Sequence, residues 1–415
     1  MREQQDVVVV GGGQAGLAMS SVLQQRGREH IVLERRRIGE RWRTERWESL
    51  HFQFPNWTLQ LPGYTYSGSD PDRFAHYSEI LRVVEDYAVS TGAPVRENSE
   101  ALAITERGPG DGFEVSLAEG SIHAQRLVIA TGPFQRARIP ELARDLPPSV
   151  LQIDPTRYRS PEALPAGAVL VVGSGASGCQ IADELLHAGR RVYLAVSRHR
   201  RAPRRFRGKD FYWWLEALGR FGQTIDSFPR RQYPPSTVVT GVNGGYDVNV
   251  RQLAADGVRV IGRVIGASGP TLAIQANANQ VLDEADQAYT GFVTAARQFI
   301  SDNGIEGQFD QGEPEEPIHL PGVEESDSLN LAMEGINTII WATGYAYDFD
   351  WIKVPVFDGH GRPVQQRGVT PVPGLYFLGL HWMHTFRSGL FSGVGADAEF
   401  LADHMDEYVN LIEGQ

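Results

Sequence analysis

Two glycine-rich segments carry the clearest chemical signal in this chain of 415 residues. They read VGGGQAG at Val10–Gly16 and VGSGASG at Val172–Gly178, each after β-branched residues and before apolar residues at helical spacing. Glycines at this spacing permit a tight turn, close approach of the backbone to a pyrophosphate, and close packing of a helix on a strand. Both segments therefore predict a strand–turn–helix unit whose helix N-terminus binds phosphates. The expected contacts are Gly11, Gly13, Gln14, Ala15 and Gly16 in the first unit, and Gly173, Gly175, Ala176 and Ser177 in the second.

The residues after each unit's second strand predict which dinucleotide the unit binds. Glu34 follows the apolar run His30–Leu33, about 20 residues beyond the first loop, where a carboxylate binds ribose hydroxyls. The same offset in the second unit leads to Val196, which Ser197 and Arg198 follow, and no carboxylate stands there. Arginine can bind the extra phosphate of NADPH, which a carboxylate would repel. We therefore predict FAD in the first unit and NADPH in the second. The alternatives are that Glu34 is a solvated charge and that Ser197 and Arg198 are ordinary surface residues.

Composition limits the class of protein. The length of 415 residues is enough for two or three domains, and the contents of 41% hydrophobic and 22% charged residues are typical of a globular protein. The net charge of −12 argues against nucleic-acid or anionic-membrane partners, and no apolar run approaches the ~20 residues that span a bilayer. The single cysteine, Cys179, excludes an internal disulfide and a redox cysteine pair. We expect a cytoplasmic protein, and no metal site because the histidines are scattered.

The pattern along the chain predicts an α/β fold with two Rossmann-like dinucleotide-binding domains. We expect the NADPH domain, residues 163–337, to be inserted into an FAD domain formed by residues 1–162 and 338–415. Periodicity predicts helices over 80–89, 281–300 and from Gly393 or Val394 onward, and strands over 113–117, 121–129, 338–341 and 375–378. We interpret the proline-rich stretch 133–165 as a linker and 313–325 as an exposed loop.

Further short motifs follow in a consistent order. They are GERWR at 39–43, ATGPF at 130–134, RRFRGKD at 204–210, ATGY at 342–345 and SGLFSGVG at 388–395. Together with the two glycine loops, they cover most of the chain. This combination resembles the single-component flavin-containing monooxygenases, especially bacterial members and the plant indole-3-pyruvate monooxygenases.

The resemblance implies a reaction in which NADPH reduces FAD, and the reduced FAD takes up molecular oxygen as a C4a-(hydro)peroxide. One oxygen atom would then enter a small organic substrate at nitrogen, sulfur or an activated carbon, while the protein orients the cofactors and excludes water. We expect a substrate with a flat or apolar part, and the resemblance leaves a homodimer open. Two alternatives remain: an NADPH oxidase or flavin reductase that releases H2O2, and a non-catalytic flavin-binding redox sensor.

The resemblance also assigns roles to individual residues. Gln53 lies where a polar residue neighbours the flavin, with Asn56 as its rival, although a buried amide is often only a satisfied core group. A helix that opens at Gly393 would aim free N–H groups at the charge of the reduced flavin. The other expected cofactor contacts are Arg35, Trp42, Arg43, Ala130, Thr131, Gly132, Arg204, Arg205, Thr343, Gly344, Gly379, Ser392 and Val394.

One family pattern is largely missing. The fingerprint F-x-G-x-x-x-H-x-x-x-(Y/F), aligned on Tyr158, meets Pro148, Val150 and Asp154 in place of its first three defining residues. In the family, the linker with this fingerprint holds NADP(+) in the site. Because the pattern is missing here, the resemblance does not predict the lifetime of the peroxide. His381, Trp382 and His384 are better candidates for a substrate pocket than Trp213 and Trp214, since aromatic residues are more often core.

Overall fold

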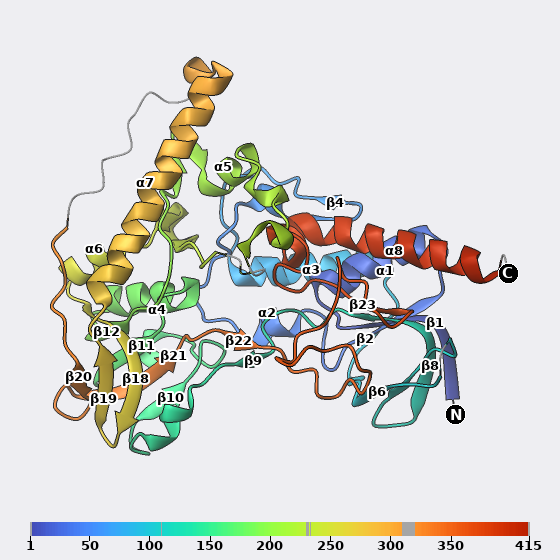
Figure 1. Cartoon of the computed structure of the whole chain (residues 1–415), viewed down its shortest axis with the longest axis horizontal. Coiled ribbons are helices and arrows are strands. Elements are labelled where there is room, and N and C mark those ends of the chain that lie inside the picture. The colour runs from blue at the N-terminus through green and yellow to red at the C-terminus, as the bar shows by residue number, and fades with distance from the viewer. Residues whose placement is uncertain (1, 109, 230–231, 233, 309–319, 414–415) are drawn as a thin grey trace.

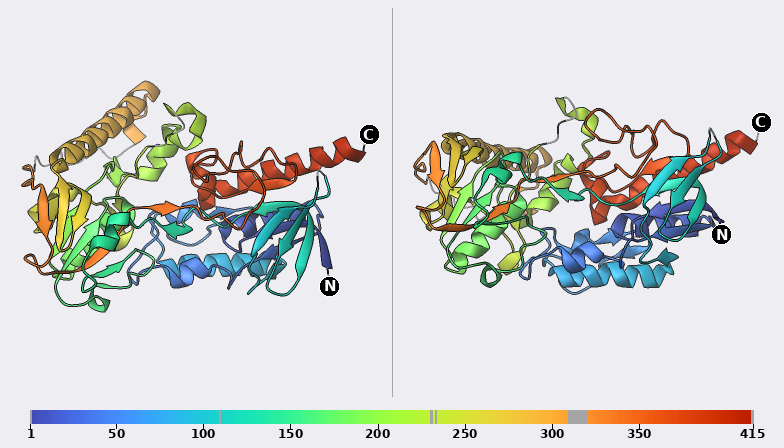
Figure 2. Two further views of the ribbon diagram at one scale, coloured as in Figure 1. Left: turned by 60° about the horizontal axis from the view of Figure 1, so that its bottom comes forward. Right: turned by 90° about the horizontal axis from the view of Figure 1, so that it is seen from below.

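The computed structural model describes residues 2–108, 110–229, 232, 234–308 and 320–413. The chain forms two bodies that lie side by side along the longest axis in every view, each built around its own sheet (Figures 1 and 2). Both sheets carry parallel strands flanked by helices, as in doubly wound nucleotide-binding folds. The predicted α/β fold with two dinucleotide-binding units is confirmed.

The first sheet has seven strands and holds the first glycine loop. Its order is β5-β2-β1-β8-β7-β6, and β23 also pairs with β8. The bounds are β1 Arg2–Val10, β2 His30–Leu33, β5 Val95–Arg96, β6 Ala103–Glu106, β7 Phe113–Ser116, β8 Ser121–Ile129 and β23 Leu375–Phe377. The strands β5, β2, β1, β8 and β23 run parallel, whereas β6 and β7 are antiparallel.

The second sheet has five parallel strands and holds the second glycine loop. Its order is β10 (Leu151–Ile153), β21 (Ile336–Trp341), β11 (Ala168–Val172), β12 (Val192–Ala195) and β17 (Arg259–Ile261). A small antiparallel sheet of β18 (Arg263–Ser268), β19 (Thr271–Gln275) and β20 (Ser328–Asn330) adjoins it. The stretch predicted as a linker is therefore partly structured, because β10 forms an edge strand. The exact domain boundaries stay a prediction.

Helices follow the periodicity of the apolar residues. The first sheet carries α1 (Gln14–Gln25), α2 (Glu40–Thr44), α3 (Tyr77–Thr91) and α8 (Phe391–Glu413). The second body carries α4 (Ala176–His187), α5 (Phe211–Ala217), α6 (Val250–Ala255) and the long α7 (Ala278–Asn303), which stands out in Figure 1. The helices predicted over 80–89 and 281–300 are confirmed. Most of the predicted loop 313–325 lies outside the described residues.

The chain passes between the two bodies twice, and the two connecting segments pair with each other as short strands. The first crossing contains β9 (Arg136–Ala137) and the second contains β22 (Tyr345–Ala346), and the two strands are antiparallel. Each crossing directly follows an Ala-Thr-Gly turn at the end of a central strand. The pairing therefore ties together the carboxyl edges of both sheets, which is where doubly wound folds bind ligands.

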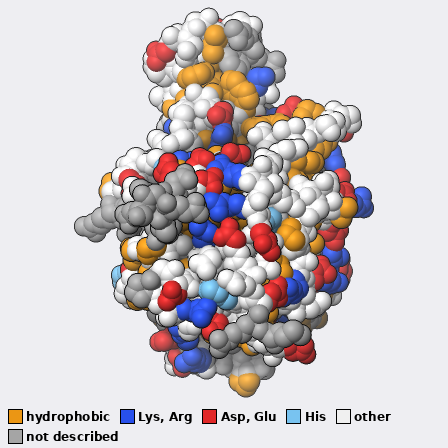
Figure 3. Space-filling view, turned by 90° about the vertical axis from the view of Figure 1, so that its right-hand side faces the viewer, with side chains coloured by type: hydrophobic (Ala, Val, Ile, Leu, Met, Phe, Trp, Pro, Cys, Tyr) orange, Lys and Arg blue, Asp and Glu red, His pale blue; other side chains and the backbone are white. Residues whose placement is uncertain are grey.

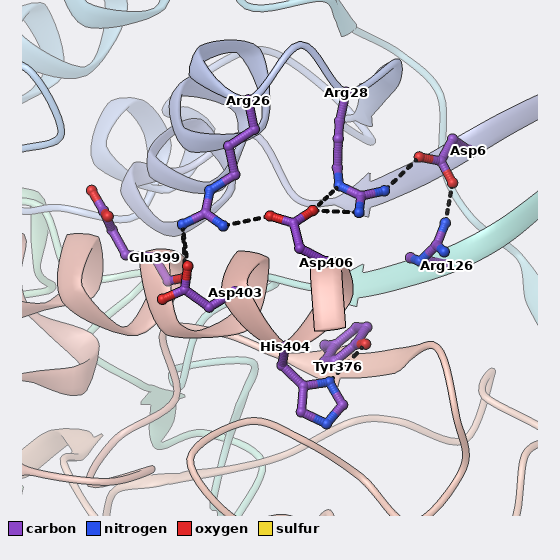
Figure 4. A network of polar contacts seen from close by, with 9 residues as sticks. All are labelled: Asp6, Arg26, Arg28, Arg126, Tyr376, Glu399, Asp403, His404 and Asp406. Atoms are coloured by element: carbon purple, nitrogen blue, oxygen red, sulfur yellow. Dashed lines mark hydrogen bonds and ion pairs between the residues drawn. The ribbon is translucent and has the colours of Figure 1, made fainter. Parts of the chain in front are cut away.

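Ion pairs hold α8 along α1. Arg26, at the end of α1, lies 2.6 Å from Asp403 and 2.7 Å from Asp406, and Arg28 donates through Nε to Asp406 at 2.9 Å and pairs with Asp6 at 3.1 Å (Figure 4). On the surface at this end of the molecule, acidic and basic side chains intermix (Figure 3). The network fixes α8, whose first turn begins beside the expected flavin site.

We predict that Asp406→Asn lowers the free energy of unfolding by about 1 kcal/mol at pH 7. The two arginine partners outweigh desolvation and lower the pKa of Asp406 in the folded state. A lowered folded-state pKa gives stability that is present above the usual carboxyl pKa of about 4. This contribution is lost as the pH falls through the lowered value. Urea unfolding at several pH values measures it, and the more exposed Asp403→Asn is the milder control. Equal urea midpoints for wild type and Asp406→Asn at pH 7 would contradict the role of the network.

Candidate functional site

Of the three glycines that form the spaced pattern of the first loop, Gly11, Gly13 and Gly16, only Gly13 has open space around it. Gly11 has a φ of +119°, and a Cβ built there would lie 2.5 Å from the carbonyl oxygen of Ala130. A Cβ on Gly16 would lie 1.8 Å from the carbonyl oxygen of Gly11. A Cβ on Gly13 would meet no atom within 4 Å. The open space at Gly13 faces the start of α1, where a pyrophosphate could accept hydrogen bonds from free N–H groups.

The second loop repeats this geometry. Gly173 has a φ of +110°, and its Cβ would lie 2.4 Å from the carbonyl oxygen of Ala342. A Cβ on Gly178 would lie 1.8 Å from the carbonyl oxygen of Gly173, whereas Gly175 again has open space around it. Both cradles therefore fit a phosphate at the middle glycine. Gln14 and Ala15 begin α1 and Ala176 and Ser177 begin α4, as predicted.

Glu34 lies against the first loop. Its Oε2 accepts a hydrogen bond from the Gly12 N–H at 2.8 Å, and its Oε1 accepts one from the Arg36 N–H at 2.9 Å. Each carboxylate oxygen keeps a second lone pair for a ribose hydroxyl. The arrangement suits the adenosine half of a dinucleotide that carries no extra phosphate. The neighbouring Arg35 side chain is exposed.

At the corresponding place in the second body, a cavity of about 400 Å³ opens beside the end of β12. Ser197, Arg198, Arg263 and Glu284 are among its lining residues, and the first two are exposed to it. The hydroxyl of Ser174, within the second glycine loop, accepts from the Ser197 N–H at 2.9 Å and donates to the Ser197 carbonyl at 2.7 Å. The cavity is therefore fixed to the loop and offers two guanidinium groups to an anion.

Arg263 was not predicted from the sequence. It lies on β18, a strand that the glycine-loop pattern does not include, and no local motif marks it. The other two arginines expected to bind NADPH, Arg204 and Arg205, have protein contacts in this structure. Arg204 is 3% exposed and pairs with Asp210, and Arg205 donates to the carbonyl oxygen of Gly244 at 2.9 Å.

The two candidate catalytic amides both have buried oxygen atoms. Neither Gln53 Oε1 nor Asn56 Oδ1 has a hydrogen-bond partner among the described residues. Asn56 is fully buried, and its Nδ2 donates to the Asp70 carbonyl at 3.1 Å. The NH2 group of this amide therefore stabilises the surrounding loop. An unpaired buried acceptor costs about 1–3 kcal/mol, which a ligand that donates a hydrogen bond would offset. Gln53 is the better placed of the two for such a ligand.

Aromatic contacts connect the Gln53 segment to the start of α8 and to α2. The Phe52 ring lies 5.9 Å from that of Phe391 and 6.0 Å from that of Trp42. On the other side of Gln53, the Phe54 ring stacks on Tyr212 of α5 at 4.1 Å. The segment thus touches both bodies.

The loop before α8 lies directly on the first glycine loop. A Cβ on Gly379 would come within 2.5 Å of the Ala15 Cβ, and Gln14 donates to the Gly389 carbonyl at 3.4 Å. The start of α8 differs from the prediction. The helix begins at Phe391, because the N–H groups of Gly393 and Val394 donate to the Leu390 carbonyl at 3.2 and 3.0 Å.

The prediction that Gly393 and Val394 present free N–H groups is therefore wrong. The first N–H groups of the helix belong to Phe391 and Ser392. Gly393 instead provides close packing, since a Cβ there would lie 2.2 Å from the Arg387 Cβ.

The remaining expected cofactor contacts lie near the crossings and α2. Thr131 accepts from Gln135 Nε2 at 2.9 Å and is followed by Gly132, and Thr343 donates to the Arg138 carbonyl ahead of Gly344. Arg43 forms an ion pair with Glu85 of α3. The Thr343 hydrogen bond and the pairing of β9 with β22 place both Ala-Thr-Gly turns where the two bodies meet.

The aromatic residues near the site divide into core and loop. Trp214 is fully buried and donates through Nε1 to the Phe206 carbonyl, so it is a core residue. Trp382 has a left-handed φ of +51°, uncommon for a bulky residue, and packs on Phe228 and Phe386. Burial lowers the pKa of the neighbouring His381 to about 4, so its imidazole is neutral at physiological pH. Residues held in strained backbone conformations, as Trp382 is, concentrate at functional sites.

Thiol chemistry has no support in this site. Cys179 is fully buried on α4, and burial raises the pKa of its thiol. In the described part of the chain, no group of His, Cys, Asp and Glu side chains could hold a metal ion, and no helix is long and apolar enough to cross a bilayer.

The residues that align with the family's linker fingerprint have structural roles in this chain. Tyr158 is fully buried and donates to Glu184 of α4 at 2.9 Å. The Asp154 carboxylate accepts from the N–H and the hydroxyl of Thr156 at 2.8 and 2.6 Å. Asp154 therefore caps its own turn.

Comparisons with known proteins agree with this geometry. A family model described as pyridine nucleotide-disulphide oxidoreductase matches residues 8–220. An uncharacterised CzcO-like oxidoreductase of Geobacillus kaustophilus is 33% identical over 403 residues, which cover 95% of this chain and 97% of that protein. The indole-3-pyruvate monooxygenase YUCCA1 of Oryza sativa subsp. japonica is 30% identical over 196 residues, 46% of this chain and 47% of that protein.

The fold also matches a solved structure along its length. A flavin-containing monooxygenase from Stenotrophomonas maltophilia superposes with a TM-score of 0.67 at 18% identity, covering 98% of this chain and 99% of that one. The chain therefore belongs to the pyridine nucleotide-disulphide oxidoreductase family.

Proposed function

We propose that this protein is an NADPH-dependent flavin monooxygenase that transfers one oxygen atom from O2 to a small organic substrate at nitrogen, sulfur or an activated carbon. The observation that carries the proposal is the pair of glycine cradles, each open at its middle glycine, with different residues beyond them. Glu34 adjoins the first cradle and the Ser197–Arg198 cavity adjoins the second. The first therefore suits FAD and the second NADPH.

Each part of the site has a distinct task in this proposal. Gly13 and the start of α1 hold the FAD pyrophosphate, and Gly175 and the start of α4 hold that of NADPH. Arg198 and Arg263 bind the 2′-phosphate, since two guanidinium groups favour a dianion. FAD, when bound, accepts a hydride from NADPH and in its reduced form reacts with O2.

Gln53 supplies a hydrogen-bond acceptor at the reacting ring system, with Asn56 behind it in the same loop. The aromatic side chains of Phe52, Phe54 and Tyr212 keep this region dry. The same apolar surroundings favour a substrate with a flat or apolar part. Residues 1–162 and 338–415 then form the FAD domain, and residues 163–337 form the NADPH domain.

The identity of the second cofactor can be tested at Arg198. Replacing Arg198 by Ala removes a charge-assisted contact worth about 1.5–3 kcal/mol. We expect the KM for NADPH to rise about tenfold or more, because each 1.36 kcal/mol is a factor of about ten. The KM for NADH should hardly change, and NADH serves as the internal control. If steady-state assays show an equal rise in KM for NADPH and NADH, the 2′-phosphate binds elsewhere.

The cradle itself can be tested with two glycines of the same loop. Gly175 has a φ of −73° and open space, so Gly175→Ala should fold normally but obstruct the phosphates of NADPH. We expect its melting temperature to stay near that of wild type while the KM for NADPH rises about tenfold or more, a loss of about 1.4 kcal/mol in binding.

Gly178→Ala is the matched comparison. Its Cβ would collide with the Gly173 carbonyl, so this variant should lose stability in thermal unfolding. If Gly175→Ala binds NADPH as wild type does, the phosphate does not lie at Gly175 and the assignment fails.

A further inference from the structure

A segment of the second body contacts the loop that carries Gln53. It includes α5 and the hairpin of β13 (Arg205–Phe206) and β14 (Lys209–Asp210). It also includes Gly241, where a Cβ would lie 2.4 Å from the Phe52 carbonyl oxygen and 2.7 Å from the Phe74 Cβ. No side chain fits between this segment and the residues just before Gln53. The second body therefore touches the first directly at the candidate catalytic residue.

Arg204 is the charged group at this contact. It is 3% exposed, and its Nη1 donates to the main-chain carbonyl of Gln53 at 2.7 Å. Its Nε lies 2.9 Å from Oδ2 of Asp210, itself 7% exposed. The guanidinium group lies over the Phe74 ring at 4.0 Å and over the Tyr212 ring at 5.4 Å. A planar guanidinium held by a carboxylate, a carbonyl and two rings has little freedom to move.

Asp210 extends the contact to the other side of Gln53. Its carboxylate also accepts from the Tyr212 N–H at 2.8 Å and so caps the start of α5. Tyr212 in turn stacks on Phe54, the residue that follows Gln53. The Arg204–Asp210 pair thus fixes the carbonyl of Gln53 directly and the next side chain through Tyr212.

The environment of Arg204 differs from that of a phosphate ligand. Arg198 is exposed in the cavity beside the second loop, whereas the charge of Arg204 is buried and already neutralised by Asp210. Binding a phosphate would require breaking that pair, and breaking a buried pair is strongly unfavourable. Meanwhile Gln53 Oε1 is buried and has no partner within the described residues. Its main chain is held while its amide stays available.

We propose that Arg204 is a positioning residue that, together with Asp210, holds the Gln53 main chain so that the Gln53 amide faces the flavin site. This inference rests on the proposed function, in which Gln53 contacts the reacting ring system. It assigns to Arg204 a role other than the phosphate contact expected from its sequence motif. It also makes the arrangement of the catalytic loop depend on the NADPH domain.

A double-mutant cycle with NADPH oxidation as the assay tests the proposal. Arg204→Lys keeps the charge but loses the planar fork, and Gln53→Ala keeps the main-chain carbonyl. We expect each single variant to lower kcat about tenfold or more, as misplaced catalytic groups do, with the KM for NADPH unchanged within about twofold. Because Arg204 acts through Gln53, the double variant should be no slower than the slower single variant.

Hydrogen exchange of the protein without added NADPH gives a readout independent of activity. Peptides that cover residues 50–57 should exchange faster in Arg204→Lys than in wild type, while peptides distant from the contacts of Arg204 with Phe74, Asp210 and Tyr212 stay unchanged. Asp210→Asn, which keeps a capping oxygen, should have the same local effect if Arg204→Lys folds poorly. Arg190→Lys is the matched control, since Arg190 also donates to main-chain carbonyls but far from Gln53, at Pro161 and Pro165.

The outcomes separate the possible roles of Arg204. Multiplicative losses of kcat in the double variant would overturn the positioning role, and so would a rise in the KM for NADPH with an unchanged kcat, which identifies a phosphate ligand. Unchanged exchange over residues 50–57 in both Arg204→Lys and Asp210→Asn would also overturn it. If wild type neither binds FAD nor oxidises NADPH, the proposed function fails, and the exchange experiment then decides on the positioning contact alone.

Discussion

In each nucleotide-binding unit, the helix packs so closely on the preceding turn that only glycine fits at the contact. A Cβ on Gly16 or Gly178 would fall 1.8 Å from the carbonyl oxygen of Gly11 or Gly173, well inside any tolerable distance. This approach brings the helix N-terminus over the end of the central strand. Four main-chain N–H groups of the first turn then lack partners within the helix. A bound pyrophosphate can satisfy them, and the helix dipole adds to the attraction.

The same constraint sets the relation between the two bodies. The carbonyl oxygens of Ala130 and Ala342 lie against the first glycine of each loop, so each Ala-Thr-Gly turn is part of a cradle. The chain crosses between the bodies immediately after these turns, and the crossings pair as β9 and β22. The two open glycine positions therefore lie at sheet edges that the paired crossings connect. Such an arrangement suits two cofactors that exchange a hydride, because reactants held in position react faster than reactants that must meet by diffusion.

The sequence predicted the parts of this structure that depend on local pattern. The two strand–turn–helix units follow from the glycine spacing. Their different dinucleotides follow from Glu34 in the first unit and from the missing carboxylate near Ser197 in the second. All of these signals come from residues close together in the chain. Strong periodicity similarly located α3 and α7. The strand β10 escaped prediction because it is short and lies in a proline-rich stretch, where tertiary pairing decides its conformation.

Other features depend on contacts between distant segments. Arg263 joins the cavity through a strand order that no motif encodes. The motif around Arg204 predicted a cofactor contact, but Asp210, Phe74 and Gln53 bury this arginine. At α8, a pattern centred on Gly393 suggested a later start, whereas the Leu390 carbonyl already accepts the first helical hydrogen bonds. Charge and glycine content alone could not distinguish these structural roles from ligand contacts.

The central claim is that two cofactors occupy the two cradles and that electrons pass from one to the other. Anaerobic titration of the purified flavoprotein with NADPH, followed by visible absorbance, tests it most directly. The account predicts that about one NADPH per bound FAD removes the absorbance of the oxidised flavin, because a hydride carries both electrons, and that admitting O2 restores it. A flavin that dithionite reduces but NADPH leaves oxidised would contradict the account.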